Sequence, residues 1–156
     1  MNRPSVASLA VPLVTCLATL GMLTAWTVTG NAGTPAQLTV TEGLVLVPSG
    51  SEATAAFFTI RNSGGADDVL TGVTGPAGHR AMLGRTVDIG RNARSMAMVR
   101  TVTVPAGGIV RMTPTTLDIM ISPPPALAPG DQLTVTLHFR DSPPQTVRAR
   151  AVRPGD

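Results

Sequence analysis

Residues 127–139 read LAPGDQLTVTLHF, and the second half of this stretch alternates strictly between apolar and polar side chains. The apolar positions are Leu133, Val135, Leu137 and Phe139. A period of two residues is typical of a β-strand that has one face in the core and the other in solvent. We therefore predict a half-buried strand over residues 132–139, with these four side chains pointing inward.

Short runs of similar character recur along the chain after residue 33, separated by clusters of Gly, Pro, Asn, Asp and Ser. They read QLTVTEGLVLV (37–47), ATAAFFTIR (53–61), SMAMVRTVTV (95–104), GIVRMT (108–113), LDIMI (117–121) and TVRARAV (146–152). Strands at this spacing are typical of an antiparallel sandwich or barrel. The predicted fold class is all-β, because no stretch after residue 33 supports a helix of three turns.

The N-terminal segment has a different character from the rest of the chain. Residues 6–28 read VASLAVPLVTCLATLGMLTAWTV and contain no Asp, Glu, Lys, Arg or His, over a length that can span a bilayer as a helix. The small-x-small sequence at residues 30–32 is compatible with signal-peptide cleavage. A cleaved signal peptide and an uncleaved signal anchor both stay open, and either one places the rest of the chain outside the cytoplasm. We predict a targeting segment over residues 1–33 and one domain over residues 34–156.

Cys16 lies inside this apolar segment and is the only cysteine of the chain. A lipid attachment site is one interpretation, but the apolar run continues past Cys16, and Thr15 is larger than the residue expected before a lipidated cysteine. We interpret Cys16 as an ordinary apolar residue of a membrane segment. The exported domain is then expected to have no disulfide and no thiolate metal site.

Charge and motif content argue against several classes of function. The 12 basic residues are all Arg and the net charge is +3, without a basic cluster interleaved with aromatic residues, so nucleic-acid binding is not expected. The sequence has no Gly-rich phosphate loop, no Ser nucleophile in an elbow and no Cys–His pair. We predict that the protein is not an enzyme.

Methionine is concentrated in the middle of the chain. The five residues between positions 82 and 120 are Met82, Met96, Met98, Met112 and Met120. Met96 and Met98 share a face in a strand, and so do Asp118 and Met120. A buried carboxylate without a partner is costly, so we expect Asp118 at a partly exposed rim. Met82 and Met112 are interpreted as side chains that fill gaps in the core.

Several motifs resemble the periplasmic copper chaperones of the PCu(A)C family. They are AAFFTIRNSGGADDVLTGV (55–73), VPAGG (104–108), the stretch at 127–139 and the closing TVRARAV. The resemblance covers the predicted domain from Leu38 to Val152. It implies a cupredoxin-like antiparallel Greek-key sandwich, preceded here by the N-terminal hydrophobic helix. The family carries Cu(I) toward the Cu(A) centre of cytochrome c oxidase.

The same resemblance implies a metal site. The family holds copper with a His, a later Met, and a His-x-Met that follows this Met by 22 residues, the distance from Met96 to position 118 here. Counting back from VPAGG places the first Met at Met96 and the His-x-Met at Asp118-Ile119-Met120, with the first His falling at Gly84. Both thioethers are present, and both imidazoles are missing.

Other donors could complete this site. Met98 shares the face of Met96 and would add a third sulfur, and His79, five residues before Gly84, could swing in from a turn. Two thioethers and a carboxylate are a poor donor set for Cu(I), so weak binding and no binding both stay open.

Two functions follow from the sequence. The first is an exported copper-binding chaperone outside the cytoplasm, anchored to the membrane if the N-terminal segment is not cleaved. It delivers or holds Cu(I) for cytochrome c oxidase assembly or copper homeostasis, with cytochrome c oxidase or another copper protein as its partner. The second is a membrane-tethered sandwich that has lost its copper site and binds a protein partner.

Overall fold

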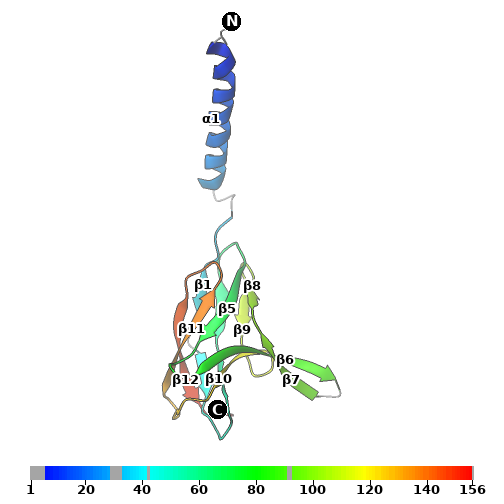
Figure 1. Cartoon of the computed structure of the whole chain (residues 1–156), viewed down its shortest axis with the longest axis vertical. Coiled ribbons are helices and arrows are strands. Elements are labelled where there is room, and N and C mark those ends of the chain that lie inside the picture. The colour runs from blue at the N-terminus through cyan, green and yellow to red at the C-terminus, as the bar shows by residue number, and fades with distance from the viewer. Residues whose placement is uncertain (1–5, 29–32, 42, 91–92, 156) are drawn as a thin grey trace. The chain divides into compact units, whose positions relative to one another are not determined.

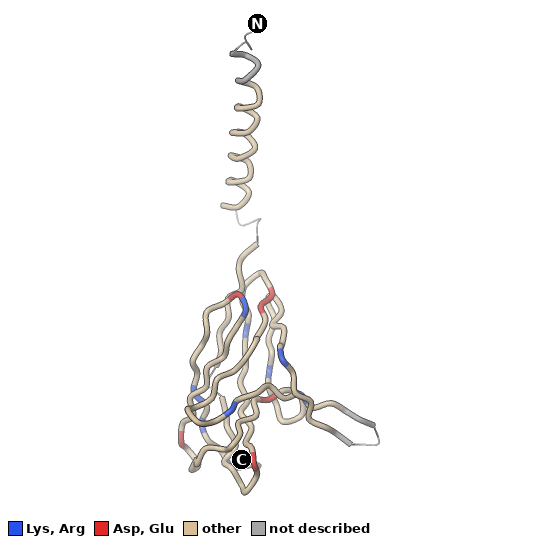
Figure 2. Tube along the Cα trace, in the orientation of Figure 1, with Lys and Arg blue, Asp and Glu red and all other residues tan. Residues whose placement is uncertain are grey.

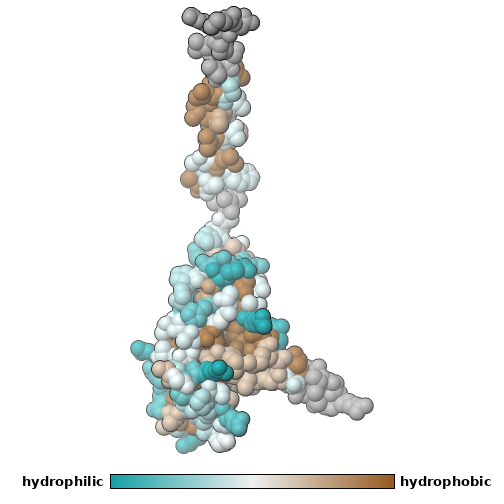
Figure 3. Space-filling view, in the orientation of Figure 1, coloured by the Kyte–Doolittle hydropathy of each residue, from teal (hydrophilic) through white to brown (hydrophobic). Residues whose placement is uncertain are grey.

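The structure, a computed structural model, describes residues 6–28, 33–41, 43–90 and 93–155 and divides into two compact units, Met1–Thr34 and Pro35–Asp156. The first unit contains helix α1 (Val6–Val28), and the second contains strands only (Figure 1). Within α1, Val11–Val28 is long and apolar enough to cross a membrane. Its large apolar side chains are exposed (Figure 3), and its described part carries no charge (Figure 2).

The strands described in the second unit confirm the all-β prediction. They are β1 (Leu38–Val40), β2 (Gly43–Leu46), β3 (Thr54–Phe57), β4 (Thr59–Asn62), β5 (Asp68–Thr74), β6 (Arg80–Gly90), β7 (Ala93–Val99), β8 (Val102–Val104), β9 (Ile109–Arg111), β10 (Leu117–Ser122), β11 (Gln132–Phe139) and β12 (Gln145–Val152).

Two sheets form a nearly closed sandwich. The larger sheet has the order β7-β6-β10-β3-β2-β12-β11-β5-β8, and the smaller one has the order β1-β4-β9. All described strand pairs are antiparallel except β2 with β12. Strands distant in sequence, such as β3 and β10, are neighbours in the larger sheet, so the chain crosses over repeatedly to build it.

The predicted inward face of β11 is confirmed. Leu133, Val135, Leu137 and Phe139 are all buried, while His138 points outward with its Nε2 atom 2.7 Å from the Thr74 hydroxyl. All the described core residues belong to the second unit, and none comes from α1. This unit therefore has a hydrophobic core of its own.

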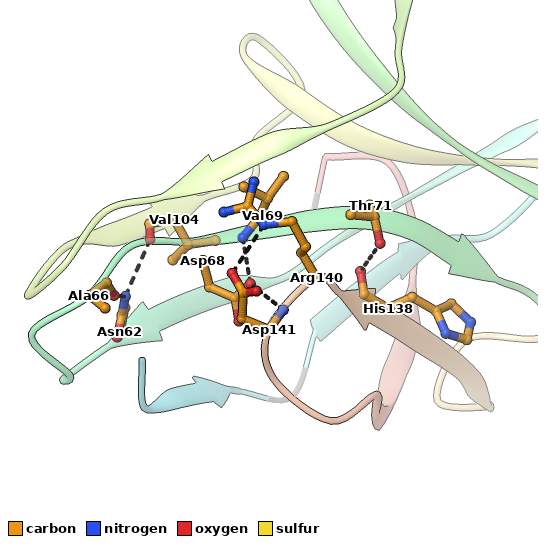
Figure 4. Close-up of polar contacts among 9 residues, drawn as sticks. All are labelled: Asn62, Ala66, Asp68, Val69, Thr71, Val104, His138, Arg140 and Asp141. Atoms are coloured by element: carbon orange, nitrogen blue, oxygen red, sulfur yellow. Dashed lines mark hydrogen bonds and ion pairs between the residues drawn. The ribbon is translucent and has the colours of Figure 1, made fainter. Parts of the chain in front are cut away.

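Two buried polar side chains bind the loops at one end of the sandwich (Figure 4). The Asn62 amide donates hydrogen bonds to the carbonyls of Ala66 at 2.8 Å and Val104 at 3.3 Å. The Asp68 carboxylate accepts one from the Asp141 backbone N–H at 3.0 Å. These hydrogen bonds hold the loops in a specific conformation.

Strand β6 was not predicted from the pattern of residues. It pairs with β10 over six residues and then with β7, and the β6–β7 pair extends from the body of the sandwich as a ribbon (Figure 1). The sequence RAMLGRTVDIG conceals the strand because Gly84 and Arg85 interrupt its apolar alternation. This strand is central to the site, since it lies between the two strands that carry the predicted ligands.

Candidate metal centre

The register of β6, β7 and β10 gathers sulfur on one face of the larger sheet. Gly84 of β6 pairs with Asp118 of β10 on one side and with Met98 of β7 on the other. Met120 pairs with Met82. Directly paired residues project from the same face of a sheet, so these side chains are neighbours.

Met96 of β7 belongs to the same face, because it pairs with Thr86, two residues from Gly84. The opposite face supplies the core, where Leu83, Leu117 and Ile119 are buried. The described methionines of these three strands therefore all project away from the core, including Met82, which the sequence analysis interpreted as a core side chain.

A pocket of about 240 Å³ opens on this face. Three of the predicted ligands line it together: Met96, Asp118 and Met120. The remaining wall comes from residues 46–55 and from Pro154 near the C-terminus. The positions counted from the VPAGG motif thus converge on one concave site, although they belong to two strands that are not adjacent in the sheet.

The expectation that Asp118 occupies a partly exposed rim is wrong. Only 3% of this residue is exposed, and its Oδ1 atom lies close to Gly84 of β6. Its Oδ1 atom is buried and has no hydrogen-bond partner in the part of the chain that the structure describes. Asp118 therefore lines a pocket that also contains thioethers, and its unsatisfied Oδ1 atom lies next to Gly84.

Burial raises the pKa of the Asp118 carboxyl above its ordinary value of 3.8, because removal from water disfavours the charged form. No ion pair to Asp118 is found among the described residues to offset this effect. The apo protein therefore holds a group that ionises less readily than an exposed aspartate.

Gly84 determines how closely β6 approaches this carboxyl group. An ideal Cβ atom on Gly84 would lie 2.5 Å from Asp118 Oδ1 and 3.5 Å from Met120 Sδ. A side chain at position 84 would overlap Oδ1, so glycine leaves the carboxyl group room to lie over the β6 backbone. Since both distances are measured from one point, Asp118 Oδ1 and Met120 Sδ are no more than about 6 Å apart, the sum of the two.

The other two predicted ligands lie elsewhere. Met98 is 59% exposed and lines a neighbouring pocket together with Met82. His79 directly precedes β6, five residues or about 16 Å of extended strand from Gly84. Its Nδ1 atom lies 2.6 Å from the Pro123 carbonyl oxygen.

The pairing of Met82 with Met120 was not anticipated. No signal in the sequence alone reveals it, because it depends on the register between β6 and β10.

The donor set determines what this site can bind. Across the described residues, no three His, Cys, Asp or Glu side chains group together, so a site for a hard or borderline divalent ion is not found there. Thioethers suit soft ions such as Cu(I), and a single carboxylate adds one negative charge. Met96 and Met120 fit a soft cation, and Asp118, a harder donor that suits Cu(I) less well than imidazole, contributes negative charge.

The nearly closed β-sandwich matches the cupredoxin-like fold of PCuAC domains. The chain belongs to the LpqE-like family, whose model, described as “Putative lipoprotein LpqE-like”, matches residues 38–151. No curated protein matches the chain.

Solved structures of PCuAC domains share this fold. A copper-bound PCuAC domain from PmoF2 superposes with a TM-score of 0.61 at 18% identity, covering 78% of this chain and 98% of that one. An apo PCuAC domain from PmoF1 gives 0.62 at 19% identity, covering 78% and 99%. The solution structure of apo-DR1885 from Deinococcus radiodurans gives 0.56 at 26% identity, covering 78% and 85%.

The raised pKa of Asp118 predicts a pH-dependent effect of Asp118→Asn on the metal-free domain. Near pH 3 the carboxyl group is protonated in both the folded and unfolded states, and Asn mimics it. As the pH rises above 3.8, the unfolded state releases its proton first, so the parent loses stability relative to the variant. Thermal melts should show a difference in Tm, variant minus parent, that grows as the pH rises from about 3 and levels off once the folded state has also released its proton.

Glu52→Gln is the matched control for this comparison, because Glu52 is an exposed carboxylate beside residues that line the pocket. It reports the effect of removing an exposed carboxylate at nearly the same place. An Asp118→Asn profile that rises no more than that of Glu52→Gln would contradict the assignment of a raised pKa.

Proposed function

We propose that this protein is an exported, copper-binding chaperone-like protein that holds Cu(I) in the pocket lined by Met96, Asp118 and Met120. The observation that carries the proposal is the convergence of these donors on one pocket of a PCuAC-type fold. One of the structures with this fold is described as copper-bound. The proposed role requires no catalytic residue.

The methionines would have different roles in copper binding. Met120 is partly buried beside Asp118 and would be the permanent thioether ligand, whereas Met96 is 46% exposed at the pocket. An exposed ligand can be exchanged for one from another protein without unfolding the site. Met98 pairs directly with Gly84 across β6 and β7 and would supply a further sulfur ligand. His79 would have to release the Pro123 carbonyl to take part.

Exchangeable ligands suit a protein that passes its metal on. We propose cytochrome c oxidase or another copper protein outside the cytoplasm as the recipient. Transfer would proceed by stepwise replacement of thioethers, with the exposed β7 methionines released first. Copper is cargo in this scheme, so binding has to be strong enough to hold it and weak enough to release it.

A second function, a metal-free interaction module, is favoured by one specific observation. Strand β7 is at the end of the larger sheet, and its Met96 and Met98 side chains are exposed. Edge strands with exposed apolar side chains are surfaces on which another protein can add a strand. This function predicts no copper affinity, and the copper titration described below therefore separates the two.

For the location of the protein, we propose that the domain is held at the outer side of the membrane. The helix Val11–Val28 has the length and composition of a membrane span, and the family description refers to a lipoprotein. Two modes of attachment fit these facts: an uncleaved α1, or a lipid on Cys16, the interpretation that the sequence analysis set aside.

Fractionation followed by intact-mass measurement tests this location. The chain should be found with membranes and be released by detergent but not by high salt. A mass equal to the whole chain indicates the α1 anchor, and a shortened chain that begins with a lipidated Cys16 indicates the lipoprotein mode. Recovery of the unmodified chain from the soluble cytoplasmic fraction would contradict the proposal.

Replacing sulfur without changing volume tests the copper site. Met96→Leu and Met120→Leu should each weaken Cu(I) binding by at least about tenfold, equivalent to about 1.4 kcal/mol, because each removes one soft donor. Competition against a chromophoric Cu(I) chelator measures the affinity.

The control is Met112→Leu, at a methionine that is buried in the core away from the pocket. It should leave the affinity unchanged. A parent protein that binds no Cu(I), or Leu variants at positions 96 and 120 that bind as tightly as the parent, would contradict the proposed function.

A further inference from the structure

We infer that Asp118 is itself a copper ligand, that Gly84 is the residue that positions it, and that this pair makes the site selective for a monovalent soft cation. The inference rests on the proposed function and specifies the chemistry of the same site. It starts from the two positions at which the family resemblance implies imidazoles and this chain has neither.

The absence of a side chain at Gly84 makes room for the carboxyl group of Asp118. The Asp118 Oδ1 atom occupies the space in which a side chain at position 84 would begin, 2.5 Å from the ideal Cβ position. The two residues are direct partners across β6 and β10, so the sheet holds this contact in place. A larger residue at position 84 would force the carboxyl group to move from this position. Gly84 therefore leaves room for an oxygen donor beside a sulfur donor.

The hydrogen bonding of Asp118 differs from that of the other buried aspartate. Asp68 and Asp118 each have one buried oxygen without a partner among the described residues. The other oxygen of Asp68 accepts backbone hydrogen bonds from Val69 and Asp141, whereas no such backbone bond anchors Asp118 in the described part of the chain. Leaving a buried polar atom unsatisfied is costly, and a cation bound in the pocket would remove that cost.

Charge and softness select the same kind of ion. Met96 and Met120 are neutral, so the ionised Asp118 is the only charged donor among the residues that line the pocket. A monovalent ion therefore forms a neutral centre, whereas a divalent ion leaves one uncompensated positive charge in a largely buried site, which is unfavourable. Thioethers independently favour Cu(I) over harder divalent ions. The expected ligands are Cu(I) and its monovalent analogue Ag(I), with Zn(II) disfavoured.

The test titrates the full-length chain in detergent with Cu(I), Ag(I) and Zn(II). Asp118→Asn preserves the shape of the side chain and removes its charge, and should weaken Cu(I) and Ag(I) binding by at least about tenfold. The exposed Glu52→Gln removes the same charge next to the pocket and should leave both affinities unchanged. The parent should bind Ag(I) more tightly than Zn(II).

A double-mutant cycle tests the positioning role of Gly84. Gly84→Ala should weaken Cu(I) binding because its Cβ atom displaces the carboxyl group, but in an Asp118→Ala background the same change should cost nothing further. A merely structural glycine would give additive losses. Thermal melts of the metal-free variants provide a second readout: Gly84→Ala should lower Tm in the parent, and should lower it less when Asp118→Ala is already present.

The outcomes separate this inference from the proposed function. Unchanged Cu(I) affinity in Asp118→Asn, tighter binding of Zn(II) than of Ag(I), or additive losses in the cycle would each overturn the inference. The proposed function would survive those results as long as Met96→Leu and Met120→Leu lose affinity. If neither methionine variant loses affinity, the proposed function itself fails.

Discussion

The register between β6 and β10 is the constraint on which the site depends, because it places Gly84 directly opposite Asp118. In a strand, a shift of one residue moves every side chain to the other face. Such a shift would put Asp118 and Met120 into the core and expose Ile119. The apolar residues of β10 that are fully buried, Ile119 and Ile121, prevent it. The packing of the core thus fixes the geometry of the face that carries the donors.

The face of β6, β7 and β10 that points away from the core carries the pocket. Asp118 lines this pocket together with residues 46–55 and Pro154, and the Oδ1 atom of its carboxyl group is buried next to Gly84 without a hydrogen bond from the described residues. The same burial that raises its pKa makes the metal-free protein less stable than a hydrogen-bonded arrangement would be. Binding of a monovalent cation would relieve this cost, so metal affinity and the local instability at Asp118 are linked.

Local sequence patterns predicted the parts of the structure that depend on local residues. The alternation in β11 has a period that only a half-buried strand satisfies, and its inward side chains are buried as expected. Strand β6 was missed because Gly84 interrupts its pattern, and the same glycine is what lets Asp118 lie close to the β6 backbone. The burial of Asp118 was also missed, since the residues that wall its pocket lie more than 60 positions earlier in the chain or at its end. Spacing from the VPAGG motif placed Met96, Asp118 and Met120, which line one pocket, but it carried no information about strand register.

The most direct test of the account is X-ray absorption spectroscopy of the Cu(I)-loaded protein. If thioethers and one carboxylate hold the ion, the copper edge will be that of Cu(I). Its first shell will then contain two or three sulfur atoms and one oxygen, and the oxygen contribution will change in Asp118→Asn. A shell of nitrogen and oxygen without sulfur, or one of sulfur alone that is identical in the parent and the variant, would contradict it.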